Sequence, residues 1–223
     1  SLDLSPGYLL MEGISRLYSP YDLNPFDINP LRDLIAARVD FDLVNRLDGI
    51  RAHVTATNVR SGLPRVFSTG ELSADAVLAS ACLPQMYKAV EIGGEAYWDG
   101  GFSANPALYP LVMNDASPDI IIVQINPIYR ERLPRSARDI INRANEISFN
   151  TSLVKELRTL ALAQRMAVRF GAGDKTDLGG HALYLHMIHV DEEVQDLAAS
   201  SKLSAEWEYL TVLFDRGRRW ADL

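Results

Sequence analysis

The chain has one cysteine, Cys82, among its 223 residues. A single thiol cannot form an internal disulfide, and it excludes a metal site built from several cysteines. Long apolar runs are also missing, since no stretch approaches the roughly 18–20 residues that a membrane-spanning helix needs. The first stretch, SLDLSPGYLLMEGISRLY, has no basic residues ahead of its apolar ones, so we do not expect it to be a secretory signal.

Positive charge is scarce as well. The 22 Lys and Arg residues are outnumbered by 29 Asp and Glu residues, which gives a formal net charge of -7. Because general nucleic-acid binders depend on neutralising phosphates, we expect no nucleic-acid partner. A hydrophobic content of 48% is typical of a globular protein, and this length suits one domain with room for a core.

Strand-like and helix-like stretches alternate along the chain. Alternating β-branched residues predict a strand at residues 50–59, and RVFS after the turn RSGLP predicts its partner. The continuously apolar run DIIIVQIN, residues 119–126, is typical of a central strand buried on both faces. The pattern predicts an α/β fold, with a mainly parallel sheet and helices on both faces. The other expected elements are helices at 5–18, 31–38, 41–47, 73–84, 136–170 and 204–220, and strands at 88–92, 96–98 and 182–190.

The stretch EAYWDGGFSANPALYPLV, residues 95–112, places Asp99 between a tryptophan and two glycines at the end of a predicted strand. An Asp-Gly pair is a common hairpin signal, so a plain turn is one interpretation. The other is a catalytic carboxylate, because α/β folds build their sites at strand ends. Gly100 and Gly101 would let another loop approach closely, and Asn105-Pro106 opens a helical turn instead of a partner strand.

Longer segments carry a resemblance. ATNVRSGLPRVFS and ADAVLASACLPQMYKAVEIGGEAYWDGGFSANPALYPLV, followed by IIIVQINP, NEISFNTSLVKELR and ASSKLSAEWEYL, resemble a bacterial branch of the patatin-like phospholipase family. The resemblance runs from about Leu4 to the C-terminus. It implies a three-layer α/β fold and hydrolysis of lipid acyl esters by a Ser–Asp dyad without histidine. Asp99 would be the general base, in a loop shaped by Gly100 and Gly101.

Two parts of that family's pattern are missing from the sequence: a Gly-X-Ser-X-Gly nucleophile elbow and an upstream glycine-rich oxyanion loop. The nearest match, GFSAN at residues 101–105, ends in asparagine, so Ser103 reads as a turn residue. We therefore expect residues 1–223 to be the C-terminal portion of a single patatin-like domain, incomplete at its N-terminus and inactive alone. The missing segment or another chain would complete the sheet. The alternative is a non-catalytic interaction module that keeps the fold.

The remaining candidates have simpler interpretations. Cys82 is conceivable as a thiol nucleophile, but its position near a helix C-terminus favours core packing. His186 and His189 are three apart in a predicted strand and point to opposite faces, so we expect no shared metal. We expect structural or surface roles for these and for His53 and His181, no cofactor, and a lipid or acyl-ester substrate. The expected location is the cytoplasm or the membrane periphery, with peripheral membrane contact.

Overall fold

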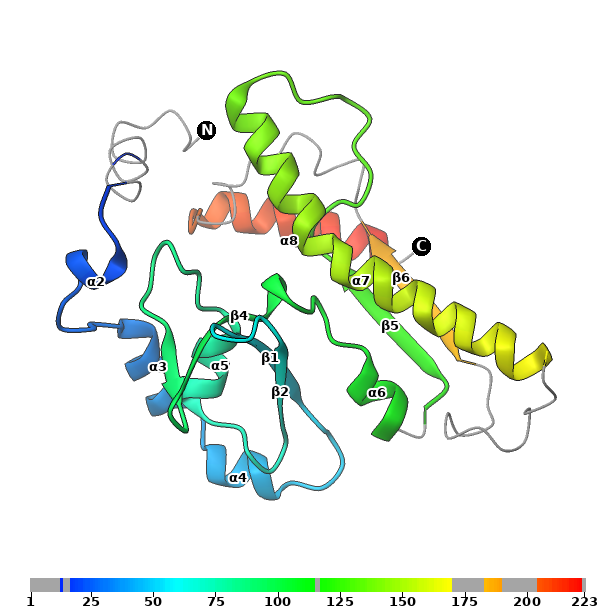
Figure 1. The fold of residues 1–223 in the computed structure, drawn as a ribbon, viewed down its shortest axis with the longest axis horizontal. Helices are drawn as coiled ribbons and strands as arrows, with labels where there is room; N and C mark the ends of the chain where they lie inside the picture. The colour runs from blue at the N-terminus through cyan, green and yellow to red at the C-terminus, as the bar shows by residue number, and fades with distance from the viewer. Residues whose placement is uncertain (1–12, 14–16, 115–116, 170–182, 190–203, 222–223) are drawn as a thin grey trace. The chain divides into compact units, whose positions relative to one another are not determined.

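The computed structural model describes residues 13, 17–114, 117–169, 183–189 and 204–221 (Figure 1). The helix expected at residues 5–18 therefore lies largely outside the described residues. The chain divides into two compact units. One comprises Met11–Pro110 and Ser152–Glu156, and the other comprises Ser1–Leu10, Leu111–Thr151 and Leu157–Leu223.

The unit around residues 11–110 contains a four-stranded sheet in the order β2-β1-β4-β3, and every neighbouring pair is antiparallel. Short connections dictate the β1–β2 and β3–β4 pairings. Gly93 and Gly94 alone join β3 to β4, and their φ angles of 61° and 81° suit a tight two-residue hairpin turn. The strands are β1 (His53–Asn58), β2 (Pro64–Ser68), β3 (Val90–Ile92) and β4 (Glu95–Asp99).

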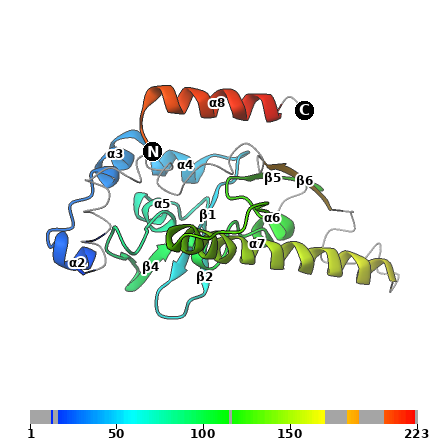
Figure 2. The same ribbon diagram turned by 90° about the horizontal axis from the view of Figure 1, so that it is seen from above.

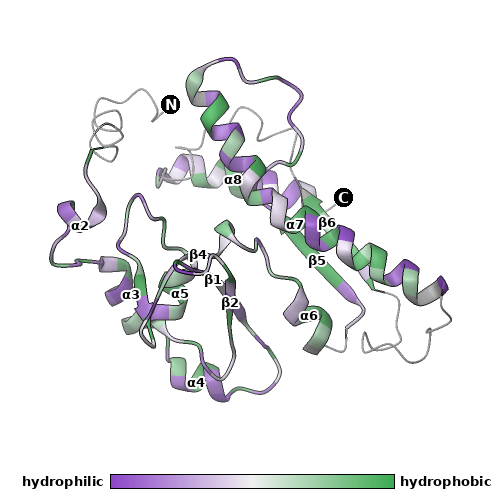
Figure 3. Ribbon diagram, in the orientation of Figure 1, coloured by the Kyte–Doolittle hydropathy of each residue, from purple (hydrophilic) through white to green (hydrophobic). Residues whose placement is uncertain are grey.

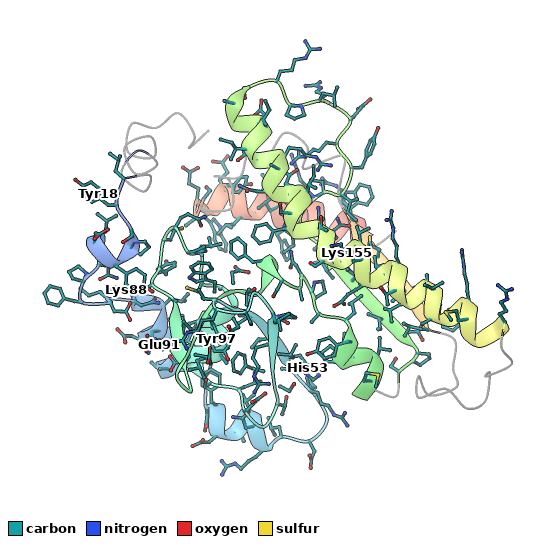
Figure 4. The ribbon with its side chains drawn as sticks, in the orientation of Figure 1. Tyr18, His53, Lys88, Glu91, Tyr97 and Lys155 are labelled. Atoms are coloured by element: carbon teal, nitrogen blue, oxygen red, sulfur yellow. The ribbon has the colours of Figure 1, made fainter. Side chains whose placement is uncertain are left out.

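Helix α5 packs on one face of this sheet, as both ribbon views show (Figures 1 and 2). Its N-terminus is capped by the side chain of Ser73, which accepts a hydrogen bond from the backbone of Ala76. Between helix and sheet, Phe67 and Tyr97 meet edge to face with ring centroids 5.6 Å apart (Figure 4 marks Tyr97). The helices of this unit are α2 (Pro20–Leu23), α3 (Pro30–Arg38), α4 (Phe41–Arg46) and α5 (Ala74–Ser80).

The other unit contains two parallel strands and long helices. Glu146 of α7 forms ion pairs with Arg130 at 2.5 Å and with Arg143 at 3.1 Å. Asn150 donates to the carbonyl of Pro127 at 3.0 Å, so the segment after β5 is tied to α7. The elements are β5 (Asp119–Gln124), β6 (Tyr184–His189), α8 (Trp207–Ala221) and all of α7 (Ala137–Arg169) except Ser152–Glu156, while α6 (Tyr109–Asn114) begins in one unit and ends in the other.

The α/β character is present, but a mainly parallel sheet is not confirmed. In the part of the chain that the structure describes, only β5 and β6 pair in parallel. The strand expected at residues 50–59 forms as β1, and its expected partner RVFS forms within β2, joined to β1 by a short turn that makes the pair antiparallel. Two consecutive strands can pair in parallel only when a crossover connection of roughly a dozen or more residues joins them.

Strand β5 was expected to be buried on both faces, and this is wrong. Its burial alternates: Ile120 and Ile122 are buried, whereas Ile121 and Val123 are 65% and 69% exposed. The strand is hydrophobic along most of its length (Figure 3), so both of its faces carry apolar side chains. Among the residues that the structure describes, only one face of the strand is buried. No described helix is long and apolar enough to cross a membrane.

Candidate active site

Asp99 is the last residue of β4 and pairs with Ala56 of the neighbouring strand β1. The chain then turns immediately into a short 3-10 helix, η2 (Gly100–Phe102). The Asp99 backbone amide donates to the carbonyl of Cys82 at 2.9 Å, just beyond the end of α5. A strand end and a helix end therefore fix the backbone of the candidate base from two sides.

The side chain of Asp99 is fixed by its own loop. The backbone amide of Gly101 donates to Asp99 Oδ1 at 2.7 Å. Among the described residues, none donates a hydrogen bond to the other carboxylate oxygen, Oδ2. Asp99 is partly buried, and Gly100 and Gly101 beside it are buried. One carboxylate oxygen thus sets the orientation of the group, and the second remains available to an incoming donor.

Gly100 is required by a close approach between two backbones. A Cβ on this residue would lie 2.1 Å from the carbonyl oxygen of Thr55 in β1 and 2.6 Å from the carbonyl carbon. Neither Gly100 nor Gly101 is among the glycines with positive φ. The Asp-Gly-Gly stretch is therefore not the hairpin turn that it resembles in sequence, and it continues into the 3-10 helix.

A pair of hydroxyls secures the far side of the loop. Thr57 of β1, only 5% exposed, donates from Oγ1 to the carbonyl of Asp99 at 2.8 Å. The same Oγ1 lies 2.8 Å from Oγ of Ser103. The backbone amide of Ser103 donates to the carbonyl of Gly100 at 3.0 Å. Ser103 is thus a loop-fixing residue, in agreement with its reading as a turn residue.

The electrostatics of the site favour a proton acceptor. Burial raises the pKa of Asp99 above its ordinary value, and the hydrogen bond from Gly101 partly offsets this. Burial also raises the pKa of the Cys82 thiol to about 11, with a smaller contribution from the charge of Asp99. The thiol is neutral near pH 7, so it places no second negative charge beside the carboxylate. A carboxylate that is partly desolvated and oriented can accept a proton from an alcohol.

The other sequence candidates lie elsewhere or in inert settings. Cys82 is 2% exposed and its thiol donates to the Lys88 carbonyl at 3.1 Å, which supports core packing. His53 Nδ1 lies 2.8 Å from Oγ of Ser68, and Figure 4 marks it on β1. His186 pairs with Asp119 at 2.8 Å in the other unit. His181 lies outside the described residues. Within the described ranges, no three or more His, Cys, Asp or Glu side chains form a metal-binding group.

Sequence reasoning missed three residues around the loop. Thr57 reads only as a strand former, because its partner carbonyl is 42 residues away. Ser152 and Glu156 lie in the middle of α7, the helix on which Figure 4 marks Lys155. Ser152 Oγ accepts from the backbone of Asn105 at 3.2 Å, and Glu156 Oε2 accepts from Leu108 at 2.6 Å. The segment NEISFNTSLVKELR, which contains both, was the available signal.

Residues 10–112 match the family model described as patatin-like phospholipase. The matched region includes the four-stranded sheet, α5 and the Asp99 loop, whereas residues 113–223 lie outside it. A search of curated proteins gives no match.

Proposed function

Because residues 10–112 belong to the patatin-like phospholipase family, we propose that this polypeptide supplies the general base of a serine-type lipid acyl hydrolase. Asp99 is that base. The observation that carries the proposal is the state of its carboxylate, with one oxygen held by Gly101, the other without a described donor, and a pKa raised by burial.

The chemistry follows from what such a carboxylate can do. A serine hydroxyl is a weak nucleophile until a positioned base accepts its proton. Asp99 takes that proton as the serine oxygen bonds to the ester carbonyl carbon. The protonated carboxyl then gives the proton to the leaving alkoxide as the ester C–O bond breaks. In the second half-reaction Asp99 accepts a proton from water, which attacks the acyl-enzyme, and returns it to the serine oxygen.

The nucleophile and the oxyanion-binding amides come from polypeptide outside residues 1–223, because the sequence has no Gly-X-Ser-X-Gly elbow. In this proposal residues 1–223 are the C-terminal portion of one three-layer patatin-like domain. An N-terminal segment or another chain completes the sheet and makes it mainly parallel. The exposed apolar side chains of Ile121 and Val123 support this, since two strands alone form a marginal sheet.

The substrate class follows from the family: a lipid or acyl ester, with no metal or other cofactor in the dyad mechanism. Contact with a membrane surface is part of the same proposal, because a lipid hydrolase must reach its substrate at an interface. The acidic balance of the chain, with a net charge of -7, does not favour a broad attraction to anionic lipids. We therefore place the protein in the cytoplasm or at the membrane periphery.

The test is Asp99→Asn in the full-length natural product, with an acyl ester as substrate. Asparagine keeps the shape and can still accept the hydrogen bond from Gly101, but it cannot accept the serine proton. We expect kcat/KM to fall by about 10²–10⁴-fold, and residues 1–223 alone to show no hydrolysis above background. Hydrolysis by the isolated chain, or undiminished activity of Asp99→Asn, would contradict the proposal.

The second candidate is a non-catalytic interaction module that keeps the fold, which is favoured by the missing elbow serine in these residues. The coding sequence upstream of Ser1 discriminates between the two. A glycine-rich loop followed by Gly-X-Ser-X-Gly supports the hydrolase, and an upstream region without them supports the module.

A further inference from the structure

Strand β1 contacts the Asp99 loop at two residues, Thr55 and Thr57. The Thr55 carbonyl lies against Gly100, where it leaves no room for a side chain. Two residues later, the Thr57 hydroxyl reaches the carbonyl of Asp99 at 2.8 Å and Oγ of Ser103 at 2.8 Å. Two nearby residues of β1 therefore hold the loop, Thr55 through its backbone and Thr57 through its side chain.

The direction of the hydrogen bonds follows from the number of protons. A hydroxyl has one proton to donate, and the Asp99 carbonyl can only accept. The proton of Thr57 is therefore given to Asp99, and the proton between the two hydroxyls must come from Ser103. The result is a one-way chain from Ser103 to Thr57 to the Asp99 carbonyl. Hydrogen bonds in such a chain polarise and strengthen one another.

This chain acts on the peptide plane that orients the carboxylate. The Asp99 carbonyl and the amide of Gly100 belong to one rigid peptide unit. If that unit turns, the amide of Gly101, one peptide further on, moves away from Asp99 Oδ1. A bond to the carbonyl oxygen therefore fixes the carboxylate as well, although it does not touch the carboxylate.

We propose that Thr57 is a positioning residue for the base Asp99, acting through the hydroxyl chain that Ser103 begins. This inference rests on the proposed function of Asp99. Thr57 touches neither the substrate nor the proton in transit. Its hydroxyl holds the Asp99–Gly100 peptide so that the carboxylate faces the incoming serine.

The experiment compares Thr57→Val and Thr57→Ser in the full-length natural product that hydrolyses acyl esters. Valine fills the same space without a hydroxyl, and serine restores the donor. We expect Thr57→Val to lower kcat by about 10–100-fold, because small misplacements of a catalytic group cost rates of this order. KM should stay within about 2-fold, since the substrate is not touched. Thr57→Ser should recover kcat to within about 3-fold of the natural protein.

Ser103→Ala provides a graded variant, because Thr57 can still donate to Asp99 without it. We expect a smaller loss of kcat, of about 2–5-fold, from the loss of polarisation in the chain. Ser68→Ala is the matched control. It removes a partly buried hydroxyl that bonds His53, which lies on β1 like Thr57, and kcat should not change.

The outcomes separate this inference from the proposed function. If Asp99→Asn is inactive and Thr57→Val keeps the natural kcat, Thr57 has no positioning role and the base assignment stands. If Asp99→Asn is active, both ideas fail. In the Asp99→Asn background, Thr57→Val should cause no further loss, because the group it positions is gone. If Thr57→Val does not fold, Thr57→Cys takes its place, because cysteine is similar in size to threonine and its thiol is only a weak donor. We expect the same loss of kcat. A kcat equal to that of the natural protein would overturn the inference.

Discussion

Gly100 and Thr55 come so close that a Cβ on Gly100 would lie 2.1 Å from the Thr55 carbonyl oxygen. The obstacle is backbone of the central strand β1, which also pairs with β2 and β4, so it cannot move aside as a flexible side chain would. The turn that presents Asp99 exists because the residue after it has no side chain.

Gly100→Ala should therefore destabilise the chain strongly. Overpacking typically costs about 1–3 kcal/mol and occasionally more, and we expect a value at or above the upper end because backbone is the obstacle. Chemical denaturation followed by circular dichroism measures it as a lower midpoint. In the full-length product, hydrolysis should fall in parallel as Asp99 is displaced.

Gly217→Ala is the matched control for this substitution. Gly217 lies inside α8, and nothing lies within 4 Å of its added Cβ. Alanine favours the helix over glycine by about 1 kcal/mol, so this variant should be neutral or slightly more stable. If both alanines had the same effect, the close contact at Gly100 would not be the cause.

Sequence patterns predicted the elements of the chain better than their pairing. The strand at residues 50–59 forms as His53–Asn58, the helix capped by Ser73 forms as α5, and the helix at 136–170 forms as Ala137–Arg169. Local patterns decide such elements, namely alternation, caps and helical periodicity. Pairing depends on the connections. The two-glycine turn at Gly93 and Gly94 is typical of an antiparallel hairpin, whereas the alternation of strands and helices elsewhere is typical of parallel pairing.

The sequence predicted the position of Asp99 at a strand end but not the residues that support its loop. Asp99 lies at a strand end as expected, because the strand and the glycines are adjacent in sequence. Thr57 and Glu156 had no local signal, since they act on Asp99 and Leu108 across 42 and 48 residues. The burial of β5 was also not predictable, because apolar residues on both faces do not tell which face is covered.

The pKa of Asp99 links stability to pH in a direction opposite to that of most carboxylates. Because burial raises it above the ordinary 3.8, the folded chain holds the proton more tightly than the unfolded chain. Stability therefore falls as pH rises from about 3.8 through the raised value. Asp99→Asn does not titrate, so its stability relative to the natural chain should increase over that window and then stay constant towards pH 7.

Thermal unfolding of the two proteins between pH 3 and 7 measures this difference. At pH 3 both carry a neutral group at position 99, and their melting temperatures should be closest there. A gap that is independent of pH, or that favours the natural chain at pH 7, would contradict a raised pKa. The expected result is a partly buried carboxylate that reduces stability at neutral pH.

Glu146 should show the reverse dependence. Burial alone would raise its pKa, but the hydrogen bonds and charges of Arg130 and Arg143 outweigh it and hold the pKa below the ordinary 4.5. The stabilisation is full above pH 4.5 and is lost as pH falls through the lowered value. Glu146→Gln should lower stability by about 1–3 kcal/mol at pH 7, since it weakens the charge-assisted hydrogen bonds that Arg130 and Arg143 donate to the carboxylate.

The control for Glu146 is Glu91→Gln on the exposed side of β3, marked in Figure 4. A surface substitution of this kind usually changes stability by less than about 0.5 kcal/mol. Urea denaturation at pH 7 and at pH 3 compares the two. If the Glu146→Gln difference were as large at pH 3 as at pH 7, the ion pairs would not be its origin.

The last prediction concerns Cys82 and decides whether a thiol has any part in the chemistry. Its pKa of about 11, against an ordinary 9.0, lowers the thiolate fraction at pH 8 by about 100-fold. Burial should slow the reaction further by excluding the reagent. We expect Cys82 in the folded chain to react with a disulfide reagent at least about 100-fold more slowly than in guanidinium chloride, where one thiol should be counted. In the full-length product, Cys82→Ala should keep its ester hydrolysis at temperatures below its unfolding. If the folded protein were labelled rapidly and lost hydrolysis at the same rate, the reactive group would be the Cys82 thiol and not the Asp99 carboxylate.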